Sequence, residues 1–195
     1  MAWVSDVIEE VTVNMIFYIQ TSNPCIVKET NTYDSKLSEA IESVFPLNTE
    51  ELILFWNYVG IPISYKYDIS YMIDDILMIL QHIQLKKSGE LLIHWLPDTF
   101  RADWKLEWSG EMISINANWE NLRGDLQKIL IHSERVELLK KEFICEWKML
   151  LKILISALKK NGYDQLIKQQ YDELVKSFND IKEYGILYRN RRCIQ

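Results

Sequence analysis

A strict alternation of large apolar and polar residues over residues 103–119 most constrains what this chain can fold into. In the segment DWKLEWSGEMISINANW, one face of the first arm carries Trp104, Leu106 and Trp108. The matching face of the second arm carries Ile113, Ile115, Ala117 and Trp119. A period of two is typical of a strand with one buried face, and the intervening Ser109-Gly110 suits a tight turn. The segment therefore predicts a β-hairpin with an aromatic core face and a polar outer face.

Local patterns predict the elements that precede this hairpin. Clusters of β-branched and aromatic residues predict strands at residues 11–20 and 90–96, and alternation predicts a short strand or an extended loop at 63–68. A helix capped by Asp34 or Ser35 is expected to run to Phe45. The capping sequence Asn48-Thr49-Glu50-Glu51 predicts a second helix that ends near residue 60. A third helix, capped by Asp68 or Ser70, is expected to reach residue 83.

The last third of the chain reads as helical. We expect one helix at residues 121–130 and a much longer one from Ser133 to Lys160, with an apolar stripe at three- and four-residue steps. Such a helix would be roughly 40 Å long. Asn161-Gly162 predicts its end, and a return helix at 164–181 would complete a helical hairpin. The chain is thus predicted to be one α+β domain over residues 1–195, a mainly antiparallel sheet packed against several helices.

The composition of the chain predicts the cell compartment in which it works and whether it holds a metal or a cofactor. With 195 residues, 48% of them hydrophobic, the chain can bury one substantial core. Acidic residues stand near the N-terminus, and the longest apolar runs are five residues, so neither a signal peptide nor a membrane span is expected. The three cysteines, Cys25, Cys145 and Cys193, form no closely spaced pair. We therefore expect a cytoplasmic protein with reduced thiols, no metal and no cofactor.

Negative charge is concentrated in the first half of the chain. Residues 1–98 carry a net charge of −9, whereas residues 99–195 carry +3, which gives the overall −6. Acidic surfaces with nearby aromatic residues are suited to binding basic partners, because charge steers the encounter and aromatic anchors stabilise the complex. The predicted partner-binding residues are the acidic side chains Asp68, Asp74, Asp75, Glu90, Asp103, Glu107 and Glu111.

Signatures of catalysis are missing from the sequence. The six glycines include no GxGxxG, no P-loop and no nucleophile elbow, and the three histidines are far apart. Two alternatives remain open. One is a hydrolase that uses His94, Asp98 and Asp103. The other is a regulatory nucleic-acid-binding module built on a row of lysines, which comprises Lys141, Lys148, Lys152 and Lys159. The basic tail with Arg189, Arg191 and Arg192 has no assigned role.

The arrangement of a small acidic α+β domain, with the Trp-rich hairpin DWKLEWSGEMISINANW leading into long helices rich in Lys and Glu, resembles immunity proteins of bacterial contact-dependent growth inhibition and related polymorphic toxin systems. The resemblance implies an inhibitor without enzymatic activity that binds a cognate toxin domain and occludes its active site. The toxin domain would be a nuclease, for instance one that cleaves tRNA, and a homodimer is compatible with the resemblance. Direct binding of nucleic acid by this chain is not expected.

Overall fold

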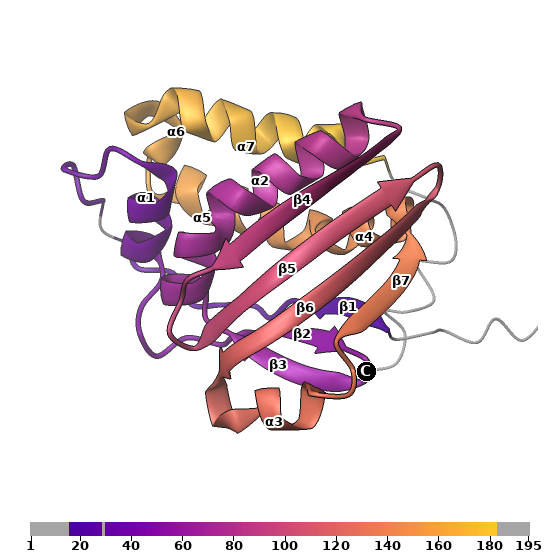
Figure 1. Ribbon diagram of the computed structural model, residues 1–195. Coiled ribbons are helices and arrows are strands. Elements are labelled where there is room, and N and C mark those ends of the chain that lie inside the picture. Colours follow the sequence, from indigo (N-terminus) through magenta and orange to yellow (C-terminus); the bar gives the residue numbers. More distant parts are fainter. Residues whose placement is uncertain (1–15, 29, 183–195) are drawn as a thin grey trace, which may run out of the picture.

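The structure is a computed structural model that describes residues 16–28 and 30–182. Two antiparallel sheets form its framework (Figure 1). The smaller sheet has the order β1-β2-β3, with strands β1 (Phe17–Gln20), β2 (Leu52–Trp56) and β3 (Val59–Ile63). The larger sheet has the order β4-β5-β6-β7, with strands β4 (Ser88–Trp95), β5 (Phe100–Ser109), β6 (Met112–Leu122) and β7 (Arg135–Leu139). The predicted α+β class is confirmed.

Helices cover one face of the larger sheet and leave the other face bare (Figure 1). The longer helices are α1 (Leu37–Val44), α2 (Ser70–Leu85), α4 (Lys140–Glu146), α5 (Lys148–Lys160) and α7 (Lys168–Asp180). Shorter helical turns are η1 (Tyr65–Ile69), η2 (Arg123–Asp125), α3 (Gln127–Leu130) and α6 (Tyr163–Leu166). In the described residues, no helix is both long enough and apolar enough to cross a membrane.

The Trp-rich hairpin is confirmed and forms the centre of the larger sheet. Strand β5 pairs with β6 so that Trp104 lies opposite Ala117 and Trp108 lies opposite Ile113. The turn uses Gly110 at a φ of +59°, a conformation that costs glycine little. Every apolar side chain on the predicted core face is buried except Trp119, which is partly buried. The polar side chains point to the bare face.

The buried ring of Trp104 lies at the centre of an aromatic cluster that joins the two sheets. Its centroid is 5.2 Å from that of Trp56 in β2 and 5.3 Å from that of Trp95 in β4. Phe17 of β1 contacts Trp104 at 6.2 Å and also contacts Phe143 of α4 at 5.0 Å. Both sheets and α4 therefore share one aromatic core.

The predicted helix at residues 48–60 is wrong, because these residues form the β2–β3 hairpin. Asn57 and Tyr58 connect the strands with φ values of 46° and 68°, which match the left-handed turns of two-residue hairpins. Inward side chains such as Leu54 and Trp56 are buried, while the alternate ones are partly exposed. The Asn57 amide also donates 3.0 Å hydrogen bonds to the carbonyls of Ser133 and Arg135, so the turn is stabilised from outside the hairpin.

The predicted single helix at residues 133–160 is also wrong. Its first part forms β7, which pairs with β6 and buries Val136 in the sheet. The remainder divides at Trp147 into α4 and α5. Ser133 does not cap a helix, and its carbonyl accepts a 2.7 Å hydrogen bond from the indole of Trp56. Residues 135–139 form a strand because they pair with β6. The helical spacing of apolar residues in this segment does not encode that pairing.

Smaller corrections concern two connecting segments. Residues 65–69 form the helical turn η1, whereas the sequence predicts an extended segment there. The predicted helix at 121–130 is reduced to η2 and α3, because β6 continues to Leu122 and Gly124 then adopts a φ of +73°. Residues 11–15 of the first predicted strand, the basic tail and Cys193 lie outside the described residues.

The predicted helical hairpin at the C-terminus is present in a shorter form. Gly162 at a φ of +75° ends the turn after α5, and α6 leads into α7. The ammonium of Lys148, at the start of α5, donates a 2.6 Å hydrogen bond to the carbonyl of Ile181, which follows α7. Because the start of one helix meets the end of the other, α5 and α7 are antiparallel.

Truncation of the central ring tests the shared core. We expect Trp104→Ala to lower the free energy of unfolding by ~3–5 kcal/mol, because it removes the ring that contacts both sheets. The control is Tyr33→Ala, since Tyr33 is 92% exposed and should change stability little. Chemical unfolding followed by circular dichroism measures both values. A Trp104→Ala variant as stable as the control would contradict the shared core.

Candidate partner-binding surface

The seven acidic residues predicted to bind a partner lie in three separate environments. Asp68 is inside the molecule, in η1. Asp74 and Asp75 lie on α2. The bare face of the larger sheet carries Glu90, Asp103 and Glu107, and the adjoining β5–β6 turn carries Glu111. The fold therefore does not bring all seven carboxylates together.

Asp68 has a structural role. Its side chain is 1% exposed and accepts hydrogen bonds from the backbone N–H of Ser64 at 2.8 Å and from the hydroxyl of Thr99 at 2.5 Å. Burial raises the pKa of this carboxyl, and the two hydrogen bonds oppose the shift only in part. The prediction that Asp68 contributes to a docking surface is wrong, because a buried carboxyl cannot reach a partner.

On the bare sheet face, Glu107 and Asp103 each contact a neighbouring basic side chain. Glu107 forms an ion pair with Lys105 at 2.8 Å, which lowers the pKa of Glu107. Asp103 binds Nδ1 of His94 at 2.6 Å. Arg135 and Glu137 form a further pair on β7. This face is therefore polar but nearly balanced in charge, and exposed pairs of this kind add little to stability.

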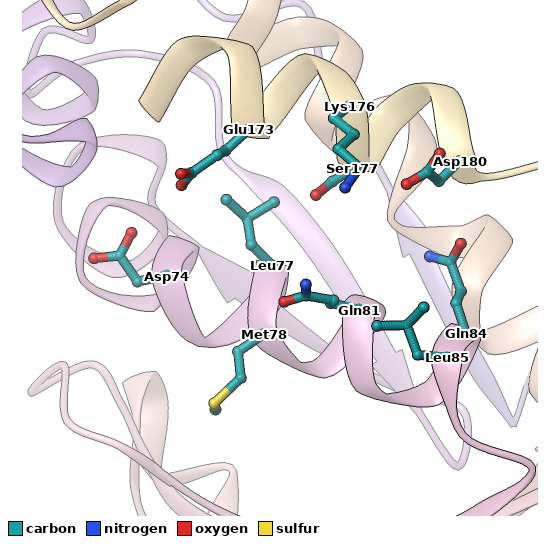
Figure 2. Close-up of a pocket in the computed structure, with 10 residues that line it drawn as sticks. All are labelled: Asp74, Leu77, Met78, Gln81, Gln84, Leu85, Glu173, Lys176, Ser177 and Asp180. Atoms are coloured by element: carbon teal, nitrogen blue, oxygen red, sulfur yellow. The ribbon is translucent and has the colours of Figure 1, made fainter. Parts of the chain in front are cut away.

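Uncompensated negative charge collects in a groove between α2 and α7 (Figure 2). The groove has a volume of about 760 Å³. Apolar side chains of α2 line part of it, and three carboxylates with one lysine surround them. The lining includes Asp74, Leu77, Leu85, Glu173, Lys176 and Asp180. In Figure 2 the amide of Gln81 and the hydroxyl of Ser177 also face the space between the two helices.

Burial disfavours ionisation of the two adjacent carboxyls on α2. Desolvation raises the pKa of Asp74; the charge of Lys36 opposes this shift, and the smaller effect of Glu173 adds to it. Desolvation also raises the pKa of the neighbouring Asp75, followed by repulsion from Asp74, while His94 has the opposite effect. A cation placed in the groove would relieve this repulsion and favour the charged carboxylates.

The seven acidic residues predicted from the sequence include none of the α7 residues that line the groove. Glu173 and Asp180 belong to the half of the chain with net positive charge, so a count of charge along the sequence directs attention elsewhere. Their spacing of seven residues is the available signal, because it places both side chains on one face of a helix. Which element that face meets is decided by the packing of α7 beside α2.

The fold brings together only some of the residues that the hydrolase and the nucleic-acid-binding alternatives would use. His94 contacts Asp103, whereas Asp98 binds the guanidinium of Arg101 at 2.6 Å. The predicted lysine row is divided, since Lys141 lies on α4 and the other three lysines lie on α5. Lys148 contacts the Ile181 carbonyl and lies 5.1 Å from the ring centre of Phe178. Within residues 16–28 and 30–182, no three His, Cys, Asp or Glu side chains are grouped to hold a metal ion.

Comparison of the chain with protein-family models, with curated proteins and with solved structures finds no match.

The buried carboxyl of Asp68 predicts a pH-dependent effect on stability. Because its pKa is raised in the folded state, the folded chain holds this proton more tightly than the unfolded chain. The favourable contribution is complete below the ordinary carboxyl pKa of about 3.9 and is lost as pH rises through the raised value. We therefore expect the stability of the natural chain, measured relative to Asp68→Asn, to fall with rising pH in this interval.

Glu107 is the control, and its effect on stability should change with pH in the opposite direction. The pKa of Glu107 is lowered by Lys105, so stability relative to Glu107→Gln should rise with pH as Glu107 ionises. Chemical unfolding of the three proteins at a series of pH values gives both differences. An Asp68 difference that rises with pH would show that its ionised form is the one stabilised in the fold.

Proposed function

We propose that this chain is a binding protein that neutralises a cognate toxin domain, and that the α2–α7 groove receives a basic segment of that domain. The observation that carries this proposal is the combination of an apolar lining with three carboxylates in one groove of about 760 Å³. Apolar side chains offer a partner buried area, and the surrounding charge selects a cationic one. The resemblance of the sequence to immunity proteins of polymorphic toxin systems points to the same class of function.

The charge distribution supports a nuclease as the target. A nuclease domain needs Lys and Arg side chains where it holds phosphate, and these same side chains complement the carboxylates of the groove. The groove lining carries three carboxylates and one lysine, so a lysine or arginine of the toxin meets excess negative charge there, unlike at the paired Glu107 of the bare sheet face. Binding of the phosphate-contacting segment would occlude the toxin's active site.

Association kinetics test the proposed docking site. The test partner is a candidate toxin domain from an open reading frame adjacent to that of this chain, purified with its active site inactivated. We expect the association rate to fall as salt rises, because exposed charges are screened beyond roughly 8 Å at physiological ionic strength. The variant Asp74→Lys/Glu173→Lys should associate more slowly by at least about tenfold at low salt. Stopped-flow fluorescence measures these rates.

A matched control separates the groove from overall charge. Glu120→Lys/Glu134→Lys makes the same change in net charge at exposed sites away from α2 and α7. It should slow association far less than the groove variant. Equal rates for the two variants would assign the effect to net charge alone, and a rate independent of salt would contradict electrostatic docking.

A hydrolase is the second candidate, favoured by one observation. Nδ1 of His94 lies 2.6 Å from Asp103, an arrangement that can orient an imidazole for general base catalysis. The His94 side chain is 59% exposed on an open sheet, however, where water competes for each contact that a catalytic base would make.

Protection by substituted variants distinguishes the two candidates. Under the proposed function, cells that express the toxin should be rescued as well by His94→Ala, His132→Ala or Ser133→Ala as by the natural chain. The measurements are growth during co-expression, toxin affinity and thermal unfolding of each variant. A variant that binds and folds normally but does not protect would favour the enzyme.

A further inference from the structure

Strand β4 forms an outer edge of the larger sheet, and in the described residues no strand pairs with its other side. The sheet has the order β4-β5-β6-β7, so β4 pairs with β5 only. At eight residues, β4 is long for an edge strand, and its sequence SGELLIHW contains neither lysine nor proline, the residues that commonly protect such edges. Side chains on its outer face are exposed, including Leu92 at 58%.

The alternation of hydrogen-bonded and non-bonded residue pairs between β4 and β5 identifies which backbone N–H and C=O groups of β4 point away from β5. The N–H of Gly110 donates to the carbonyl of Lys87 at 3.1 Å, which makes residues 87 and 110 a hydrogen-bonded pair. Hydrogen-bonded and non-bonded pairs alternate in an antiparallel ladder, so residues 89, 91, 93 and 95 bond to β5. The backbone groups that point to the free side are those of Ser88, Glu90, Leu92 and His94. In the described part of the chain, no hydrogen bond reaches them from that side.

We propose that this edge pairs with β4 of a second copy of the chain, antiparallel and around a two-fold axis at Leu92. In this register, each Leu92 lies opposite Leu92 of the second copy, and Glu90 lies opposite the second copy's His94. Because residues 90, 92 and 94 all direct their N–H and C=O groups outward, each opposed pair can exchange two hydrogen bonds. Two four-stranded sheets then form one continuous eight-stranded sheet.

The side chains of β4 favour this register over its neighbours. With the axis at Leu92, the exposed leucines cover each other, and an acidic side chain meets an imidazole on both sides of the axis. A shift of the axis to Glu90 places two carboxylates directly opposite, which is unfavourable. Nδ1 of His94 contacts Asp103, and Nε2 can donate to the second copy's Glu90 when both ring nitrogens carry a proton.

Mutual burial of the exposed leucines and the unpaired backbone groups of β4 therefore favour a second copy as the occupant of this edge. The association does not depend on a toxin, so it stands apart from the proposed inhibitory function. Its consequence is a two-fold symmetric particle in which the bare faces of both large sheets are continuous. Isologous contacts of this type close at two subunits, because each copy uses the same β4 edge and the pairing occupies it in both.

Disulfide trapping of the full-length chain tests the register. In a Cys25→Ser/Cys193→Ser background, Leu92→Cys should form a disulfide-linked dimer on mild oxidation. Opposed residues of a hydrogen-bonded pair have Cα atoms about 5.5 Å apart, within the range that a disulfide spans. The control Ser88→Cys is on the same exposed face, but its two copies would lie roughly 27 Å apart along the strands. Equal cross-linking of both variants, or none of Leu92→Cys, would overturn the proposed register.

The oligomeric state gives an independent test. Sedimentation equilibrium should show that the natural chain dimerises over a concentration series, with a limiting mass twice its 23.2 kDa. Leu92→Lys should abolish the dimer, because it places two like charges together at the axis. Met112→Lys makes the same kind of change on the bare face of β6, away from the edge, and should leave the dimer intact. Circular dichroism checks that both variants fold. A monomeric natural chain, or a dimer that survives Leu92→Lys, would overturn the proposal.

Discussion

Contact of Trp104 with rings from both sheets is the interaction on which the rest of this structure depends. The ring is completely buried and packs against Trp56 of the smaller sheet and Trp95 of the larger one. Through Phe17, the same cluster reaches Phe143 of α4. Buried side chains of α1, α2 and α5 belong to the same core, so the strands and helices acquire their relative positions from it.

Burial of the inner face of the larger sheet determines which surfaces of the molecule remain available for binding. Because helices and the smaller sheet occupy the inner face of the β4–β7 sheet, its outer face remains uncovered (Figure 1), and β4 pairs with one strand only. Packing on the inner side also brings α7 beside α2 and creates their groove. The proposed toxin site thus uses side chains of α2 and α7, whereas the proposed dimer edge uses the backbone and outer side chains of β4.

Local pairing decides which acidic residues are available for binding. Glu107 and Asp103 belong to contacts with Lys105 and His94 on the bare sheet, and Asp68 is buried. In contrast, Asp74 lines the groove together with Glu173 and Asp180, and Lys176 is the one cationic side chain of that lining. The free energy available to a basic partner depends on this local imbalance rather than on the total charge of a half-chain.

Sequence alone determined the Trp-rich hairpin, the apolar face of α2 and the α+β class, since alternation and helical spacing are local patterns that burial preserves. Tertiary structure decided that residues 52–56 and 135–139 are strands, because each run is apolar enough for either state and is stabilised by pairing with a distant or neighbouring strand. It also decided the candidate site. Asp74 was identified from the acidic half, but Glu173 lies about a hundred residues away in the basic half. Their proximity arises only when α2 and α7 pack against the common core, an outcome of long-range packing that no local pattern contains.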